Sequence, residues 1–170
     1  MFGRIAVSLV AASVLLAPAA ARVSTGPKAA IAKVLTRQLQ GGFSRHSQAA
    51  IYAAIKPTDI NHDGVQDWQI NFDPFGSAWC GTGGCRYQLW LGQQNGSPLR
   101  VFDRQMREVS TVRRGNRIVF VFDFHGSECA GYGAEACPGE FSWDAKRGRM
   151  VLLPTPRKHT AVRSPIDPEL

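Results

Sequence analysis

Residues 109–124, with the sequence VSTVRRGNRIVFVFDF, specify the fold more clearly than any other part of this chain. The segments 109–112 and 118–124 are rich in β-branched and aromatic residues, which favour strands. Between them, residues 114–116 (Arg-Gly-Asn) supply the residue types that let a chain reverse its direction. This pattern predicts an antiparallel hairpin.

Further strands are predicted on both sides of the hairpin. Trp68, Ile70 and Phe72 alternate with polar residues, as in a half-buried strand. Asn95-Gly96 marks a turn between two other strands. The remaining predicted strands are residues 87–91, 99–102, 141–143 and 150–153. Together these segments predict an antiparallel meander of about six strands.

Two helices are predicted before the first strand. Residues 27–39 carry proline in the first turn and apolar residues at helical spacing, and two glycines follow them. Residues 47–55 have Ser47 as their N-cap, and Pro57 stops the helix. The expected fold class is α+β, with two N-terminal helices packed on the antiparallel meander.

The N-terminal 21 residues have the pattern of a signal peptide: Arg4, an apolar run and then three alanines. The apolar run is too short to span a hydrocarbon core of about 30 Å, so no membrane span is expected after cleavage. We predict a periplasmic or secreted protein. It would have one globular domain at 22–153 and a flexible, proline-rich tail at 154–170.

The composition, 170 residues of which 44% are hydrophobic, excludes wholesale disorder. The formal net charge of +7 leaves two interpretations of the basic residues near the N-terminus. They contact anionic envelope polymers or lipid head groups, or they form solvated helix faces. Nucleic acid is not expected as a partner, because the chain has an export signal and lacks the stacking-aromatic pattern of a nucleic-acid module.

The cysteines form two local pairs in sequence, Cys80 with Cys85 and Cys129 with Cys137. An even number of cysteines in an exported chain favours disulfides, and four cysteines allow three connectivities. The local pairing is preferred, because each pair is close in sequence and glycines lie between its members. Zinc binding and a redox-active pair stay open as alternatives, although neither spacing matches a common zinc site or a C-x-x-C motif.

The most specific motif is an acidic loop at residues 59–67. Oxygen-bearing side chains at its positions 1, 3, 5 and 9, with glycine at position 6, suit a hard cation. Three carboxylates this close would repel one another without a counter-ion. Calcium fits better than magnesium, because its shell accepts carbonyls and water in an irregular arrangement. The alternative is an Asx-rich turn that binds no metal.

This loop resembles the calcium loops of EF-hand and dockerin proteins, and more closely those of integrin-type FG-GAP repeats. The EF-hand likeness breaks at Ile70, where the bidentate glutamate is expected. In FG-GAP repeats a strand follows the loop, as predicted here. The resemblance implies a structural calcium clip with these ligands: Asp59, Asn61, Asp63, Val65 (through its carbonyl) and Asp67.

A wider resemblance covers roughly residues 59–145. The acidic loop, a strand, the W-C-G-x-G-G-C stretch at 79–85 and the later His-Gly-Ser-Glu-Cys stretch at 125–129 are similar to a group of small uncharacterised secreted bacterial proteins. The resemblance implies export but no particular reaction.

The candidates for catalysis cluster around the second cysteine loop, which runs from Cys129 to Cys137: His125, Ser127, Glu128, Glu135 and Glu140. Histidine beside carboxylates can act as a general acid or base, but no G-x-S-x-G, H-E-x-x-H or P-loop motif is present. Trp79, His125 and Glu128 are also candidates for ligand contacts, whereas Trp68 and Trp90 are expected in the core.

Our leading hypothesis is therefore a non-enzymatic module that binds an envelope component or another protein. The alternatives are a cell-wall hydrolase using His125 with Glu128 or Glu135, and a periplasmic lysozyme inhibitor. The sequence predicts no oligomeric state.

Overall fold

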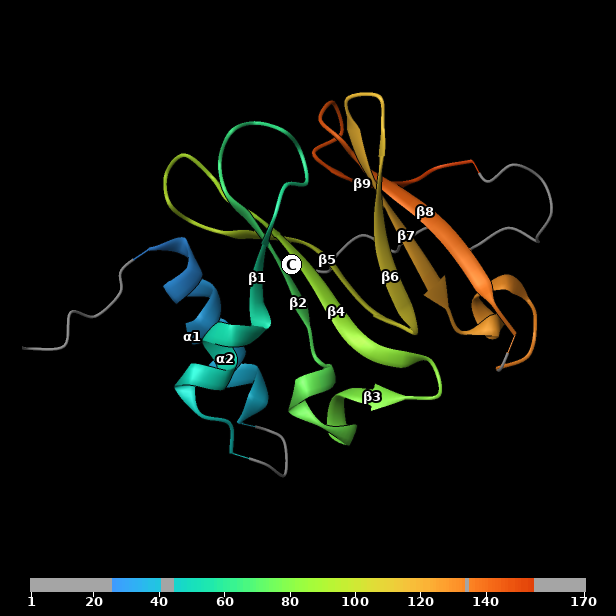
Figure 1. The fold of residues 1–170 in the computed structure, drawn as a ribbon, viewed down its shortest axis with the longest axis horizontal. Coiled ribbons are helices and arrows are strands. Elements are labelled where there is room, and N and C mark those ends of the chain that lie inside the picture. Colours follow the sequence, from blue (N-terminus) through green and yellow to red (C-terminus); the bar gives the residue numbers. More distant parts are fainter. Residues whose placement is uncertain (1–25, 41–44, 134, 155–170) are drawn as a thin grey trace, which may run out of the picture.

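A computed structural model describes residues 26–40, 45–133 and 135–154 of the chain (Figure 1). The predicted signal peptide and all of the predicted tail except Pro154 lie outside these residues. Within them the chain forms two short α-helices, nine strands and three 3-10 helices.

Both predicted helices form near the N-terminus. Helix α1, Pro27–Leu39, has its proline in the first turn and buries one apolar side. Helix α2, Gln48–Ala54, is capped by Ser47, whose Oγ accepts a 3.2 Å hydrogen bond from the backbone N–H of Ala50. The chain passes from α2 directly into a strand, because Ile55 already has extended backbone angles.

The first sheet is antiparallel and is organised around strand β4, Gly84–Leu91. On one side β4 pairs with β2, Asp67–Asn71, and with the two-residue β3, Cys80–Gly81. On its other side it pairs with β5, Leu99–Met106. The short strand β1, Ile55–Thr58, pairs with β2 at the outer edge.

The second sheet contains four strands in the order in which they occur in the chain. Strands β6, Glu108–Arg114, and β7, Arg117–Phe124, form the predicted hairpin, which is confirmed. Strands β8, Cys137–Asp144, and β9, Arg149–Leu152, complete the sheet. The 3-10 helices are η1, Asp73–Phe75; η2, Ser77–Trp79; and η3, Gly126–Cys129.

The predicted fold class, α+β with one meander of about six strands, is wrong. The structure is mostly β, with two antiparallel sheets and only two short helices. The reason lies at the corner between β5 and β6. These strands are adjacent in sequence, yet β5 pairs with β4 and β6 pairs with β7, so the chain leaves one sheet and starts another.

The first sheet is the middle layer, with the helices on one side and the second sheet on the other (Figure 1). Strand β4 shows why, because it is buried on both faces. Tyr87, Leu89 and Leu91 belong to the core between the sheets, and Trp90 belongs to the core under the helices. Trp68 is buried in this second core too, so the prediction for both tryptophans is confirmed.

Phenylalanines dominate the core between the two sheets. Phe122 is fully buried at its centre, with its ring stacked on Phe102 at 4.6 Å between centroids. The same ring lies 6.0 Å from Tyr87 and 5.5 Å from Phe141. Since Phe102 and Tyr87 come from the first sheet, Phe122 connects the two layers.

Candidate binding surface at the two cysteine loops

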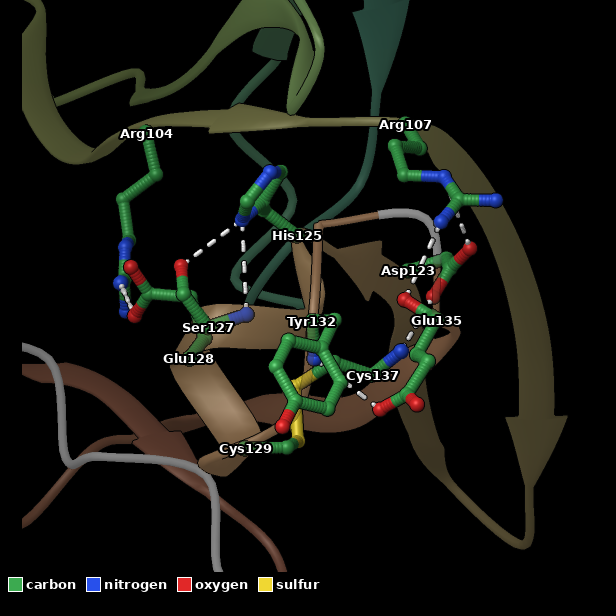
Figure 2. Close-up of a disulfide and its surroundings, with 10 residues drawn as sticks. All are labelled: Arg104, Arg107, Asp123, His125, Ser127, Glu128, Cys129, Tyr132, Glu135 and Cys137. Carbon is green, nitrogen blue, oxygen red and sulfur yellow. Dashed lines mark hydrogen bonds and ion pairs between the residues drawn. A yellow bond between two sulfur atoms is a disulfide. The ribbon is translucent and has the colours of Figure 1, made fainter.

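All four cysteines form disulfides, with the local pairing that the sequence favours. Cys80–Cys85 links paired positions of β3 and β4, with a Cα–Cα distance of 3.9 Å. Cys129–Cys137 joins the end of η3 to the start of β8, with a Cα–Cα distance of 5.7 Å (Figure 2). No cysteine is free, so no thiolate is available for zinc or thiol exchange in this state.

The disulfides indicate an oxidising, extracellular compartment. Among the described residues, neither helix has the length and apolar content needed to cross a membrane.

His125 is the point where the two cysteine loops meet. Its Nε2 lies 3.5 Å from the Thr82 hydroxyl of the first loop. Its Nδ1 lies 2.7 Å from the Ser127 hydroxyl of the second loop, as Figure 2 shows. Glycines allow this close approach. A Cβ atom at Gly133 would lie 2.6 Å from Nε2, and one at Gly83 would lie 3.4 Å from the His125 Cβ.

The two glutamates of the second loop are each held by partners other than His125. A carboxylate oxygen of Glu128 lies 2.5 Å from Nη2 of Arg104, and Glu135 accepts a 3.1 Å hydrogen bond from the Tyr132 backbone N–H (Figure 2). Within the described part of the chain, no hydrogen bond or ion pair joins either glutamate to the imidazole. In this arrangement Arg104 and the loop backbone hold the two glutamates, and the Ser127 hydroxyl is the nearest polar side-chain partner of His125 Nδ1.

A shallow pocket of about 410 Å³ lies beside the first cysteine loop and is lined by Trp79. The Trp79 ring is half-buried, and the guanidinium of Arg86 lies 5.6 Å from its centroid. Arg86 also donates two 2.6 Å hydrogen bonds to Asp103, which raise the pKa of the guanidinium above its ordinary value. Trp79 thus forms one wall of a polar, charged pocket.

This pocket continues into the region around His125. Gln105 lines the pocket and donates a 2.8 Å hydrogen bond to the Gly84 carbonyl, beside the glycines that pack on His125. Arg104 lines the same pocket and reaches Glu128. We call the combined region the Cys-loop surface, which consists of Trp79, Thr82, Arg104, Gln105, His125, Ser127, Glu128 and Tyr132.

The structure therefore brings together the three ligand-contact candidates of the sequence, Trp79, His125 and Glu128, along one surface. Arg104 and Gln105 were not among the residues predicted for this surface. Both lie in β5, and linear spacing does not show that this strand runs beside the second cysteine loop. The available signal was the polar stretch at 103–105 within an otherwise apolar strand.

The acidic loop is closed by hydrogen bonds within itself. The Asn61 and Asp63 side chains accept from the backbone N–H groups of Asp63 and Val65, at 3.3 and 2.8 Å. Asp59 lies 2.5 Å from the His62 imidazole. One oxygen of Asp63 accepts from the Asn61 amide at 2.8 Å.

Asp67 behaves differently from the other acidic residues of the loop, because its side chain is 0% exposed. Its two oxygens accept 2.8 Å hydrogen bonds from the backbone N–H groups of Ile60 and Gly92. Burial raises the pKa of the Asp67 carboxyl, and the nearby charges of Asp63 and Asp59 raise it further. Asp67 therefore fastens the loop to the end of β4.

Within the described residues, one group of three potential metal ligands has its ligand atoms within 4.8 Å of one another, namely Asp73, Cys80 and Cys85. The disulfide occupies both sulfur atoms of that group, so it offers a metal only one good ligand. The carboxylates of the acidic loop are spaced more widely than this.

A larger groove of about 860 Å³ opens between α2, the middle of the first sheet and the corner between β5 and β6. At its wall the Tyr87 hydroxyl donates a hydrogen bond to Gln69. Burial raises the pKa of the Tyr87 hydroxyl, so this side chain stays neutral well above physiological pH.

Comparison with protein families, with curated proteins and with solved structures finds no match to this chain.

Proposed function

We propose that this protein is an exported, non-enzymatic binding module of the bacterial envelope, periplasmic or secreted, and that its ligand contacts the Cys-loop surface. One observation carries the proposal. Two disulfide-closed loops, from different sheets, converge on His125, while the neighbouring glutamates are held by Arg104 and by backbone. Such a surface is fixed before the ligand arrives, which lowers the entropic cost of binding.

The surface also offers the side chains that contribute most to binding. Trp79 is half-buried at one end, and Tyr132 is 83% exposed at the other. Tryptophan, tyrosine and arginine are the residue types most often responsible for affinity at interfaces. Trp79 packs on Phe72, with 5.3 Å between ring centroids, so it is presented from a rigid base.

Substitution of the two aromatic residues tests this surface. We expect Trp79→Ala and Tyr132→Ala each to weaken binding of the oxidised full chain to isolated envelope fractions by about tenfold or more. Binding is measured by co-sedimentation in high salt, which suppresses adsorption by charge. Leu99→Ala is the matched control, because Leu99 is an exposed apolar residue (44%) away from the Cys-loop surface.

Equal binding by all four proteins would contradict the proposal. The hydrolase alternative is tested on the same preparations with Glu128→Gln combined with Glu135→Gln. We expect no release of cell-wall fragments by either form. A lytic activity that the double variant loses, while keeping its unfolding midpoint, would identify an enzyme instead.

We further propose that the acidic loop binds calcium as a structural clip, through Asp59, Asn61, Asp63, the Val65 carbonyl and Asp67. The support is the donor set, since all five ligands offer oxygen. The hydrogen bonds between these side chains and backbone N–H groups hold the loop curved, and Gly64 has a positive φ of 82° at the turn. Calcium would replace the Asn61 amide on Asp63 and the imidazole on Asp59.

Calcium titration of the oxidised chain tests the clip. With an affinity of about 10⁻⁴–10⁻³ M, as in extracellular modules without the bidentate glutamate, a tenfold excess over Kd raises the free energy of unfolding by about 1.4 kcal/mol. Calorimetry should then show a Tm increase of about 3–6 °C. Asp63→Ala should not respond. If neither protein responds, the loop is an Asx-rich turn without metal.

A further inference from the structure

The basic residues of the second sheet gather at one end. Because β6 to β9 are consecutive antiparallel strands, the turn between β6 and β7 and the turn between β8 and β9 lie at the same end of the sheet (Figure 1). The register places Arg114 opposite Arg117 and Asp144 opposite Arg149 at these turns. We call this region, residues 113–117 and 144–149, the turn end.

The turn end carries the whole charge surplus of the described chain. It contains six basic residues against Asp144, and Glu140 of β8 reaches it through two hydrogen bonds from Arg114. The described residues together hold fifteen basic and eleven acidic side chains, and when Glu140 is counted with the turn end the remainder of the domain has nine of each. The positive charge surplus of the described residues is therefore concentrated in these two turns of the second sheet.

Three of the cations at the turn end have no acidic partner among the residues that the structure describes. Arg114 pairs with Glu140, and Arg147 pairs with Asp144 at 3.1 Å. Arg113, Arg117 and Lys146 are exposed, and within the described residues no ion pair involves them. Their charges are available to an external anion.

We infer that the turn end docks on an anionic lipid surface. Guanidinium groups bind phosphate through paired hydrogen bonds, and lysine adds a point charge. The charges lie on two projecting hairpin turns. This arrangement fits a flat surface better than it fits a linear polymer chain bound in a groove. Val112, 39% exposed and next to Arg113, adds an apolar side chain at the same edge. The oxidising, extracellular compartment that the disulfides indicate favours an envelope surface over an intracellular polyanion.

The test uses the oxidised full chain and lipid vesicles. We expect binding to phosphatidylcholine vesicles that contain about one-third phosphatidylglycerol, no binding to pure phosphatidylcholine, and release in high salt. Arg113→Gln/Arg117→Gln/Lys146→Gln should weaken binding roughly hundredfold, at about fivefold for each charge. The matched control is Lys33→Gln/Arg37→Gln/Lys56→Gln, which removes three exposed cations at the helical side.

The control should lose far less affinity than the turn-end variant. Equal loss in both variants would overturn the inference, because net charge alone would then explain adsorption. Absence of binding to anionic vesicles would overturn it too. Binding to soluble polyphosphate but not to vesicles would assign the turn end to a polyanionic polymer instead. Failure here leaves the Cys-loop proposal untouched, since Trp79→Ala and Tyr132→Ala change no charge and are measured in high salt.

Discussion

Phe122→Ala is expected to lower the free energy of unfolding by about 3–5 kcal/mol. The Phe122 ring is fully buried and touches rings of both sheets, with Phe102 stacked at 4.6 Å and Tyr87 at 6.0 Å between centroids. Its removal leaves a cavity between two layers that the backbone cannot close, because hydrogen-bonded strands fix the position of each layer.

Urea unfolding followed by tryptophan fluorescence measures this loss. Val121→Ala is the control: it is the next residue on β7, is half-buried on the opposite face and should cost only about 1 kcal/mol. Phe122→Leu should fall between the two, because it keeps most of the volume. A loss for Phe122→Ala no larger than that for Val121→Ala would mean that this ring does not hold the two sheets together.

Asp67→Ala should be the second most damaging change, with a loss of about 2–6 kcal/mol. The substitution leaves the backbone N–H groups of Ile60 and Gly92 buried without an acceptor, at about 1–3 kcal/mol each. Gly92 cannot move away easily, because a Cβ atom there would already lie 2.2 Å from the Gln66 carbonyl oxygen. The unfolding measurement is made with a chelator present, so that only hydrogen bonding is compared.

The variant Asp67→Asn removes the negative charge of this side chain and one of its two hydrogen-bond acceptors. The asparagine oxygen can serve one of the two N–H groups, while its amide meets the other as a second donor, so we expect about half of the alanine loss. Asp73→Ala is the control, because Asp73 is exposed and should change stability by less than about 0.5 kcal/mol. If Asp67→Ala matches Asp73→Ala, the hydrogen bonds of Asp67 do not anchor the loop.

Local structure was predictable wherever one pattern acts alone. The β6–β7 hairpin follows from β-branched runs around Arg114-Gly115-Asn116, and the start of α2 follows from Ser47 as its cap. The division into two sheets was not predictable, because nothing in the residues near Arg107 shows that β5 and β6 pair with different partners. Strand β1 was not predicted, because Pro57 was interpreted only as the end of the second helix. Proline is also allowed in an edge strand such as β1.

In the candidate site, too, the local features were predictable from the sequence and the contacts between distant segments were not. The pairing of neighbouring cysteines follows from short separations and intervening glycines, and the structure confirms it. The meeting of the two loops at His125 depends on how the sheets stack, so contacts such as Arg104 with Glu128 could not be read from spacing. The anchoring role of Asp67 was not predicted for a related reason, because its hydrogen-bond partner Gly92 is 25 residues away in the sequence.

The direction of strand β8 determines how the domain would be oriented on a surface. This strand begins at Cys137, in the second cysteine loop, and ends at Asp144, at the turn end. Its eight residues separate the two regions by about 26 Å. If the turn end were held on a surface, the second cysteine loop at the start of β8 would therefore lie at the far end of the domain and could contact a second partner (Figure 1). The strand would act as a spacer that fixes both the orientation and the reach of the domain.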